Sequence, residues 1–220
     1  MFKNYLKITF RSLWGNKSHS FINIFGLTIG IACCILILLY VKDEWTFDTF
    51  HTKADRIYRV YVNENWGKDQ EFFYTTSPFP MGPTLKENLG EVEHQVRINP
   101  MGVQVKVEDQ QFTESILLAG RDLYKVFDFE SVKGNGDQTM QSQTGVVISE
   151  KMAQKYFGTA DPINKTLSIQ LNDVFEDFTV GAVIQDIPTN SSLQFDVMIS
   201  DLNFPKLFSE QVLNEAWFNI

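Results

Sequence analysis

The residues of this chain that could do chemistry are few and widely spaced. Histidine occurs only at positions 19, 51 and 94, and cysteine only at positions 33 and 34. The sequence contains no G-x-x-x-x-G-K-[ST] phosphate loop, no H-E-x-x-H or C-x-x-C metal pattern and no G-x-S-x-G nucleophile pattern. We therefore predict no catalytic, cofactor-binding or metal-binding residue, and expect the chain not to be an enzyme.

The element that dominates the sequence is an uncharged apolar run, residues 21–41. A helix rises 1.5 Å per residue, so a run of this length spans about 30 Å, the thickness of the hydrocarbon layer of a bilayer. A cleaved signal peptide has a shorter apolar core of about 7 to 15 residues, followed by small residues. Lys42 and Asp43 follow this run instead. The sequence predicts a transmembrane helix.

The charges on either side of the run predict its orientation. Lys3, Lys7, Arg11 and Lys17 precede it without any acidic residue, which holds an N-terminus in the cytoplasm. We expect a cytoplasmic segment at 1–20, a transmembrane helix at 21–41 and an external domain at 42–220. That domain has 15 basic and 27 acidic residues, a formal charge of about −12, which argues against nucleic acid as a partner.

The two N-terminal parts carry the candidate contact residues. Lys3, Lys7 and Arg11 recur along one side of an amphipathic helix, so we expect these residues and Lys17 at the cytoplasmic lipid interface. The alternative is a basic flank that only sets topology. Gly26 and Gly30 form a G-x-x-x-G pair, which lets a second helix approach closely, although glycine is also common in membrane helices.

One acidic segment with a histidine follows the apolar run. Asp43, Glu44, Asp48 and His51 could suggest metal ligands. A lone histidine among solvated carboxylates is more often part of a polar cap where the chain leaves the bilayer, and we favour that interpretation. An enzyme built on scattered side chains would need a cleft that gathers His51 or His94 with carboxylates.

The external domain shows an α+β pattern in which strands dominate. Ser149 is a good N-cap for a helix that Gly158 would end. We expect strands at 55–62, 95–107, 112–118, 145–148, 166–171 and 178–184, helices at 83–89, 122–127 and 150–157, a loop at 133–137 and a structured turn at 186–191. With no cysteine, this domain must be held by its core.

Four segments together resemble the MacB/FtsX-type permease subunits of ABC transporters, in the form abundant in Bacteroidetes-like bacteria. The matching segments are residues 4–30, the post-membrane stretch 43–60 with Asp48 to His51 and Arg56-Ile57-Tyr58-Arg59-Val60, the stretch 147–163, and the stretch 180–192. The resemblance implies an α+β MacB-like periplasmic core domain in the bacterial inner membrane, preceded by one span and followed by three more. Because the sequence ends at Ile220 without those spans, we expect a chain truncated at its C-terminus.

The resemblance also implies a function. A separate ABC ATPase subunit would bind the cytoplasmic face, two permeases would associate as a homodimer or heterodimer, and a periplasmic adaptor is a further candidate partner. ATP hydrolysis would drive conformational change in the periplasm, for export of antimicrobial, peptide or lipoprotein-like substrates. The alternative is a single-span periplasmic sensor or ligand-binding module, which the cytoplasmic part of about twenty residues disfavours because it leaves no room for an output domain.

Overall fold

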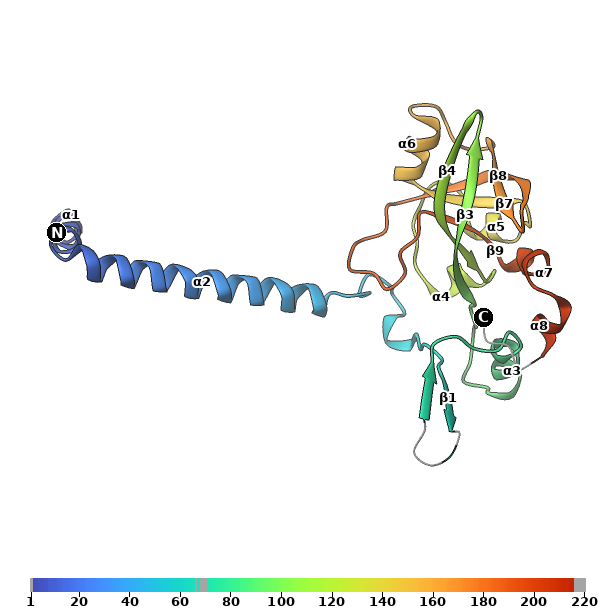
Figure 1. Cartoon of the computed structure of the whole chain (residues 1–220), viewed down its shortest axis with the longest axis horizontal. Helices are drawn as coiled ribbons and strands as arrows, with labels where there is room; N and C mark the ends of the chain where they lie inside the picture. The colour runs from blue at the N-terminus through green and yellow to red at the C-terminus, as the bar shows by residue number, and fades with distance from the viewer. Residues whose placement is uncertain (1, 66, 68–70, 216–220) are drawn as a thin grey trace. The chain divides into compact units, whose positions relative to one another are not determined.

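The computed structural model describes residues 2–65, 67 and 71–215 and divides into two compact units, residues 1–47 and 48–220 (Figure 1). The first unit consists of helix α1 (Phe2–Gly15) and helix α2 (Lys17–Trp45), joined where the Ser20 hydroxyl donates to the Leu13 carbonyl at 3.1 Å. The predicted N-terminal helix is therefore confirmed.

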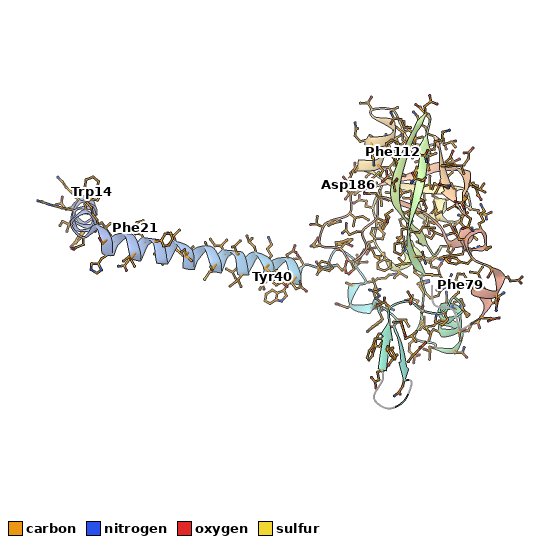
Figure 2. The ribbon with its side chains drawn as sticks, viewed as in Figure 1. Trp14, Phe21, Tyr40, Phe79, Phe112 and Asp186 are labelled. Carbon is orange, nitrogen blue, oxygen red and sulfur yellow. The ribbon has the colours of Figure 1, made fainter. Side chains whose placement is uncertain are left out.

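Helix α2 is the one helix of the described chain that is long and apolar enough to cross a membrane. It begins at Lys17 and ends at Trp45, so it runs several residues beyond the apolar run at both ends. Side chains stand out on all its sides between Phe21 and Tyr40 (Figure 2), and none of those described is buried. A helix that is apolar all round is one that lipid or other helices surround.

The second unit is built around a curved seven-stranded sheet in the order β5-β8-β6-β9-β4-β3-β7. Its strands are β3 (Ile98–Val107), β4 (Gln110–Ala119), β5 (Ser131–Gly134), β6 (Gly145–Ser149), β7 (Thr166–Leu171), β8 (Val174–Ile184) and β9 (Val197–Ser200). Strand β7 pairs with β3 on one side and with β8 on the other, which closes six of the strands into a barrel. Strand β5 lies outside this ring and pairs with the C-terminal half of β8.

The two faces of this sheet carry two separate apolar clusters. Alternate residues of the six barrel strands form the inner cluster, which includes Ile116, Ile148 and Phe178. The opposite faces of β4, β6, β8 and β9 form the outer cluster, which includes Leu117, Val147 and Met198. Because side chains alternate across a strand, residues next to each other in sequence enter different clusters.

The second unit also contains short helices. They are α3 (Met81–Asn88), α4 (Leu123–Val126), α5 (Gly136–Met140), α6 (Glu150–Phe157), α7 (Phe204–Leu207) and α8 (Glu210–Asn214), with 3₁₀ turns at Ala54–Arg56 and Asp201–Asn203. Helix α6 packs Met152 and Tyr156 against the inner cluster, and α7 adds Phe204. The α+β, strand-rich fold expected from the sequence is confirmed.

Two of the expected elements are wrong. Residues 55–62 form a 3₁₀ turn and an irregular stretch, and the strand β1 (Val62–Asn65) begins only at Val62, where it meets β2 (Glu71–Tyr74). Alternating residues make a strand only where a partner strand lies beside them, and Tyr58 is 84% exposed. The loop expected at 133–137 is also wrong, because β5 extends to Gly134 and the Asn135 side chain caps α5.

Helix α6 agrees with the prediction at both ends, and its cap is testable. The Ser149 hydroxyl accepts a hydrogen bond from the Met152 N–H at 3.2 Å and donates to Asp196 Oδ1 at 2.9 Å. Since Ser149 is fully buried, we expect Ser149→Ala to lower the free energy of unfolding by about 1 to 2 kcal/mol. Chemical denaturation checks this, with Ser209→Ala, which removes the cap of the peripheral helix α8, as the control. An equal loss of unfolding free energy in the two variants would contradict the assignment of Ser149 as a buried helix cap.

Candidate functional site

The residues that could do chemistry lie apart from one another. His19 lies on α2, and His94 Nδ1 lies 3.4 Å from Asp122 Oδ2. Within the described ranges no three histidine, cysteine, aspartate or glutamate side chains are placed to hold a metal ion. His51 is 4% exposed, so the prediction that it forms part of a solvated cap is wrong.

A region with many hydrogen bonds lies directly after helix α2. We call residues 48–53 the post-helix segment, and all of them belong to the unit that contains the barrel. This segment contacts two stretches that are distant in sequence: residues 125–129, which run from the end of α4 toward β5, and residues 190–192. The latter belong to the loop 186–196, which leads into β9 and which we call the acceptor loop.

Asp48 joins the post-helix segment to the acceptor loop. Its backbone N–H donates to the Asn190 carbonyl at 2.9 Å, and its Oδ1 accepts from the Ser192 N–H at 2.8 Å. Its Oδ2 accepts from the Ser192 hydroxyl. Asp48 has a φ of 56°, in the left-handed region, which aspartate tolerates better than most residues. Both the backbone and the carboxylate of Asp48 therefore hold this contact.

The ionisation of Asp48 follows from the same contacts. Burial opposes the charged form, but the hydrogen bonds from Ser192 and Ser191 and the nearby His51 outweigh it and lower the pKa of Asp48 below 3.8. The carboxylate is therefore charged throughout the neutral range. Its stabilising contribution is complete above the ordinary aspartate pKa and is lost as the pH falls through its lowered value.

His51 joins the same segment to residues 127–129. Its ring centroid lies 4.0 Å from that of Phe50, 5.2 Å from Phe127 and 5.4 Å from Phe129. The Asp128 N–H donates to His51 Nδ1 at 3.1 Å. His51 Nε2 is buried and has no hydrogen-bond partner among the described residues. The imidazole is thus held by aromatic packing and one hydrogen bond.

Thr52 and Lys53 complete the contact with this loop. The Thr52 N–H and hydroxyl both donate to Asp128 Oδ2, at 2.5 and 2.9 Å, and Lys53 Nζ donates to the Lys125 carbonyl at 2.7 Å. Hydrogen bonding from the Thr52 N–H is the main cause that lowers the pKa of Asp128 below 3.8. Two charged carboxylates therefore hold the post-helix segment: Asp48 accepts from Ser192, and Asp128 accepts from Thr52.

The acceptor loop is itself held firmly. Asp186 Oδ1 accepts from the Lys151 N–H at the start of α6 at 2.9 Å, and Gln194 Nε2 donates to the Pro188 carbonyl at 2.7 Å (Figure 2 labels Asp186). Phe195 packs into the outer cluster together with Phe129, and Phe50 of the post-helix segment packs against that cluster. A displacement of the post-helix segment would therefore act on the barrel wall through apolar packing as well as through hydrogen bonds.

A second polar cluster connects the chain before β3 to the barrel. The Arg97 guanidinium lies 3.3 Å from the Phe79 ring centroid, donates to the Phe79 carbonyl at 2.7 Å, and lies 3.6 Å from Asp201 Oδ2. Burial raises the pKa of Asp201 above its ordinary value, although Arg97 and Arg121 oppose this shift. We interpret this cluster as a contact that stabilises the fold, because each of its charged side chains has a partner.

The site residues predicted from sequence lie in the first unit. Gly26 and Gly30 are exposed on α2, and a Cβ added at either would meet nothing within 4 Å in the described chain. Lys7 and Arg11 are exposed on α1, the backbone of Lys3 is helical, and Lys17 Nζ lies 5.7 Å from the Trp14 ring centroid. None of these observations tests a contact with lipid or with another helix.

The Asp48 contact is the feature of this region that sequence reasoning missed. Both of its ends lie in segments that carry the family resemblance, the post-membrane stretch and the stretch ending at Ser192. However, 144 positions separate Asp48 from Ser192. The shared polar character of the two segments was a signal, but a single sequence does not show which segments meet.

Comparison with known proteins agrees with this fold. The family model of the MacB-like periplasmic core domain matches residues 20–219. A crystal structure of a domain of a permease protein from Porphyromonas gingivalis superposes with a TM-score of 0.58 at 24% identity, covering 71% of this chain and 65% of that one. This chain thus spans just under two thirds of that structure. No curated protein matches the sequence.

Two other solved structures match over shorter stretches. They are the periplasmic region of MacB from Actinobacillus actinomycetemcomitans (TM-score 0.43, 16% identity, 56% of this chain and 55% of that one) and the extracellular domain of the noncanonic ABC-type transporter YknZ from Gram-positive bacteria (0.37, 17%, 47% and 51%). The resemblance found in the sequence is confirmed by the family model. Since that model covers residues 20–219, the chain belongs to the family of MacB-like periplasmic core domains.

Proposed function

We propose that this chain is part of a permease subunit of an ABC transporter of the MacB/FtsX type. A partner ATPase would hydrolyse ATP in the cytoplasm, and the permease would convert this into conformational change of the periplasmic domain, for export of antimicrobial, peptide or lipoprotein-like substrates. The chain itself would have no catalytic role. Membership of the MacB-like family and the apolar helix α2 support this proposal.

The observation that carries the proposal is the attachment of the post-helix segment. A helix that only anchors a domain needs no bonding at its exit, because a flexible linker is sufficient. Here Asp48 begins to bond to the acceptor loop three residues after α2 ends at Trp45. Short, bonded connections transmit displacement, so this arrangement suits a protein that passes movement from membrane helices to an outer domain.

The orientation implied by this proposal can be tested by cysteine labelling. In a chain with Cys33 and Cys34 replaced by alanine, we expect Val174→Cys, 59% exposed, to react with a membrane-impermeant maleimide in spheroplasts. Tyr5→Cys, 69% exposed on α1, should react only after lysis. The reverse pattern would place the domain in the cytoplasm and contradict the proposal.

The partner ATPase can be sought directly. We expect the tagged full chain, extracted from its native membranes in mild detergent, to retain a phosphate-loop ATPase in near-stoichiometric amount, identified by mass spectrometry. An unrelated single-span protein carrying the same tag is the control. Recovery of no ATPase, or of equal amounts with the control, would favour the single-span sensor instead.

A further inference from the structure

The buried imidazole of His51 is the one titratable side chain in the post-helix segment that could change charge near neutral pH. Its ordinary pKa of 6.5 lies within the range that cells and their surroundings cover. It occupies the contact between the post-helix segment and residues 127–129, and it is 4% exposed. A change in its charge would therefore act on the contact itself.

The hydrogen bond at Nδ1 determines which neutral form of His51 is present. Nδ1 accepts from the Asp128 N–H, so in the docked segment the ring proton must reside on Nε2. A protonated imidazole has two N–H donors and no acceptor. Protonation would thus place Nδ1–H against the Asp128 N–H, and this hydrogen bond would be lost.

The packing around the ring also disfavours a charge. The rings of Phe50, Phe127 and Phe129 surround the imidazole, and no described residue accepts a hydrogen bond from Nε2. An ion buried without polar partners loses its hydration without compensation.

Two carboxylates act in the opposite direction. Asp48 on the same segment and Asp128 on the facing loop both attract a positive charge on His51. Each is already engaged, Asp48 by Ser192 and Asp128 by Thr52. The neighbouring cation of the segment, Lys53, points its ammonium group at the Lys125 carbonyl. Burial outweighs the carboxylates, and the pKa of His51 lies below 6.5.

We propose that His51 makes the docking of the post-helix segment proton-sensitive: the segment is docked on residues 127–129 while the imidazole is neutral, and protonation of the imidazole releases it. This inference goes beyond the proposed function, because it concerns a contact within the domain and holds whatever the permease moves. In a coupled permease it would weaken the mechanical link in an acidic environment.

The direction of the pH dependence follows from the lowered pKa. Docking is at full strength above the pKa of the released histidine, about 6.5. It weakens as the pH falls below that value, and it levels off below the pKa of the docked histidine. Asp48 and Asp128 both have pKa values below 3.8. They therefore contribute no step between pH 7.5 and pH 5.

Hydrogen exchange of the full chain in lipid nanodiscs tests this. After correction for intrinsic exchange, protection of residues 48–54 should fall between pH 7.5 and pH 5, by about tenfold for each pH unit that separates the docked and released pKa values. His51→Gln, whose amide oxygen can still accept from Asp128, should show no such step. His94→Gln removes the other histidine of the domain, and in this variant the fall in protection between pH 7.5 and pH 5 should remain.

Three results would overturn the inference. They are a flat profile in the unmodified chain, a step that persists in His51→Gln, and loss of the step in His94→Gln. The post-helix segment of His51→Gln could be undocked even at pH 7.5. In that case the deciding measurement is the pKa of His51 in the unmodified chain, obtained by NMR titration of its imidazole. A pKa below 6.5 for His51 supports the inference, and a pKa at or above 6.5 contradicts it.

Discussion

Replacement of Phe178 by alanine is expected to lower the free energy of unfolding of the domain by about 3 to 5 kcal/mol. Phe178 lies on β8 and is 1% exposed in the inner cluster, where strands from the whole barrel meet. Removing its ring leaves a cavity that a closed barrel cannot fill by moving one strand, since each strand is bonded on both sides. Denaturant titration of the full chain in detergent, followed by the far-ultraviolet signal of the sheet, measures the loss.

Phe175 provides a matched control on the same strand. It lies three positions earlier, on the opposite face of β8, and is 41% exposed. Phe175→Ala removes the same atoms, so we expect a loss of less than about 1 kcal/mol, as for most exposed positions. Equal losses in the two variants would show that the face of β8 turned into the barrel has been assigned wrongly.

Replacement of Asp48 by alanine is expected to release the post-helix segment, because two features of Asp48 are lost together. Alanine removes the acceptor of both Ser192 hydrogen bonds, about 1 to 2 kcal/mol at this half-buried position. It also disfavours the left-handed φ of 56° by about 1 kcal/mol. We therefore expect the opening equilibrium of residues 48–54 to rise by a factor on the order of 30 or more, measured by hydrogen exchange.

Asparagine and glycine at position 48 separate these two features. Asp48→Asn keeps an acceptor oxygen and tolerates a positive φ, so it should retain most of the protection. Asp48→Gly adopts a positive φ freely but has no side-chain acceptor. We therefore expect the protection of its post-helix segment to lie between that of the asparagine variant and that of the alanine variant. If the alanine and the asparagine variants both keep the protection of the unmodified chain, the Asp48 side chain does not hold the segment.

The same variants connect the contact to the proposed function. In a permease reconstituted with its ATPase, we expect Asp48→Ala to reduce ATP-driven transport at least tenfold while the barrel stays folded, and Asp48→Asn to retain it. Retained transport in the alanine variant, with the segment shown to be released, would mean that movement reaches the domain by another route.

The local elements of the fold could be predicted where one short stretch decides them. Helix α6 was predicted at its observed bounds because Ser149, Gly158 and the residues between them carry the cap, the stop and the apolar face. Strand β7 agrees in the same way, and Asn172 and Asp173 after it have the positive φ values that a two-residue hairpin turn needs. Strand β9, with only four residues, was missed because so short an apolar run has no periodicity that identifies it.

The site was less predictable than the fold. The sequence placed His51 in a polar segment and suggested a solvated cap, since its neighbours Asp48 and Thr52 are hydrophilic. The phenylalanines that bury it, Phe127 and Phe129, lie more than seventy positions away. Burial of a side chain depends on residues that approach it through space, so local composition predicted the wrong environment.

By itself, the sequence determined the apolar helix, the family and most of the regular elements of the domain, because these depend on composition and on spacing along the chain. Only the tertiary structure decided that the six strands close into a barrel and that Asp48 meets Ser192 across 144 positions. A contact of that kind forms only when the folded chain brings two distant segments together, and hydrogen bonds between distant segments leave no periodic trace in one sequence.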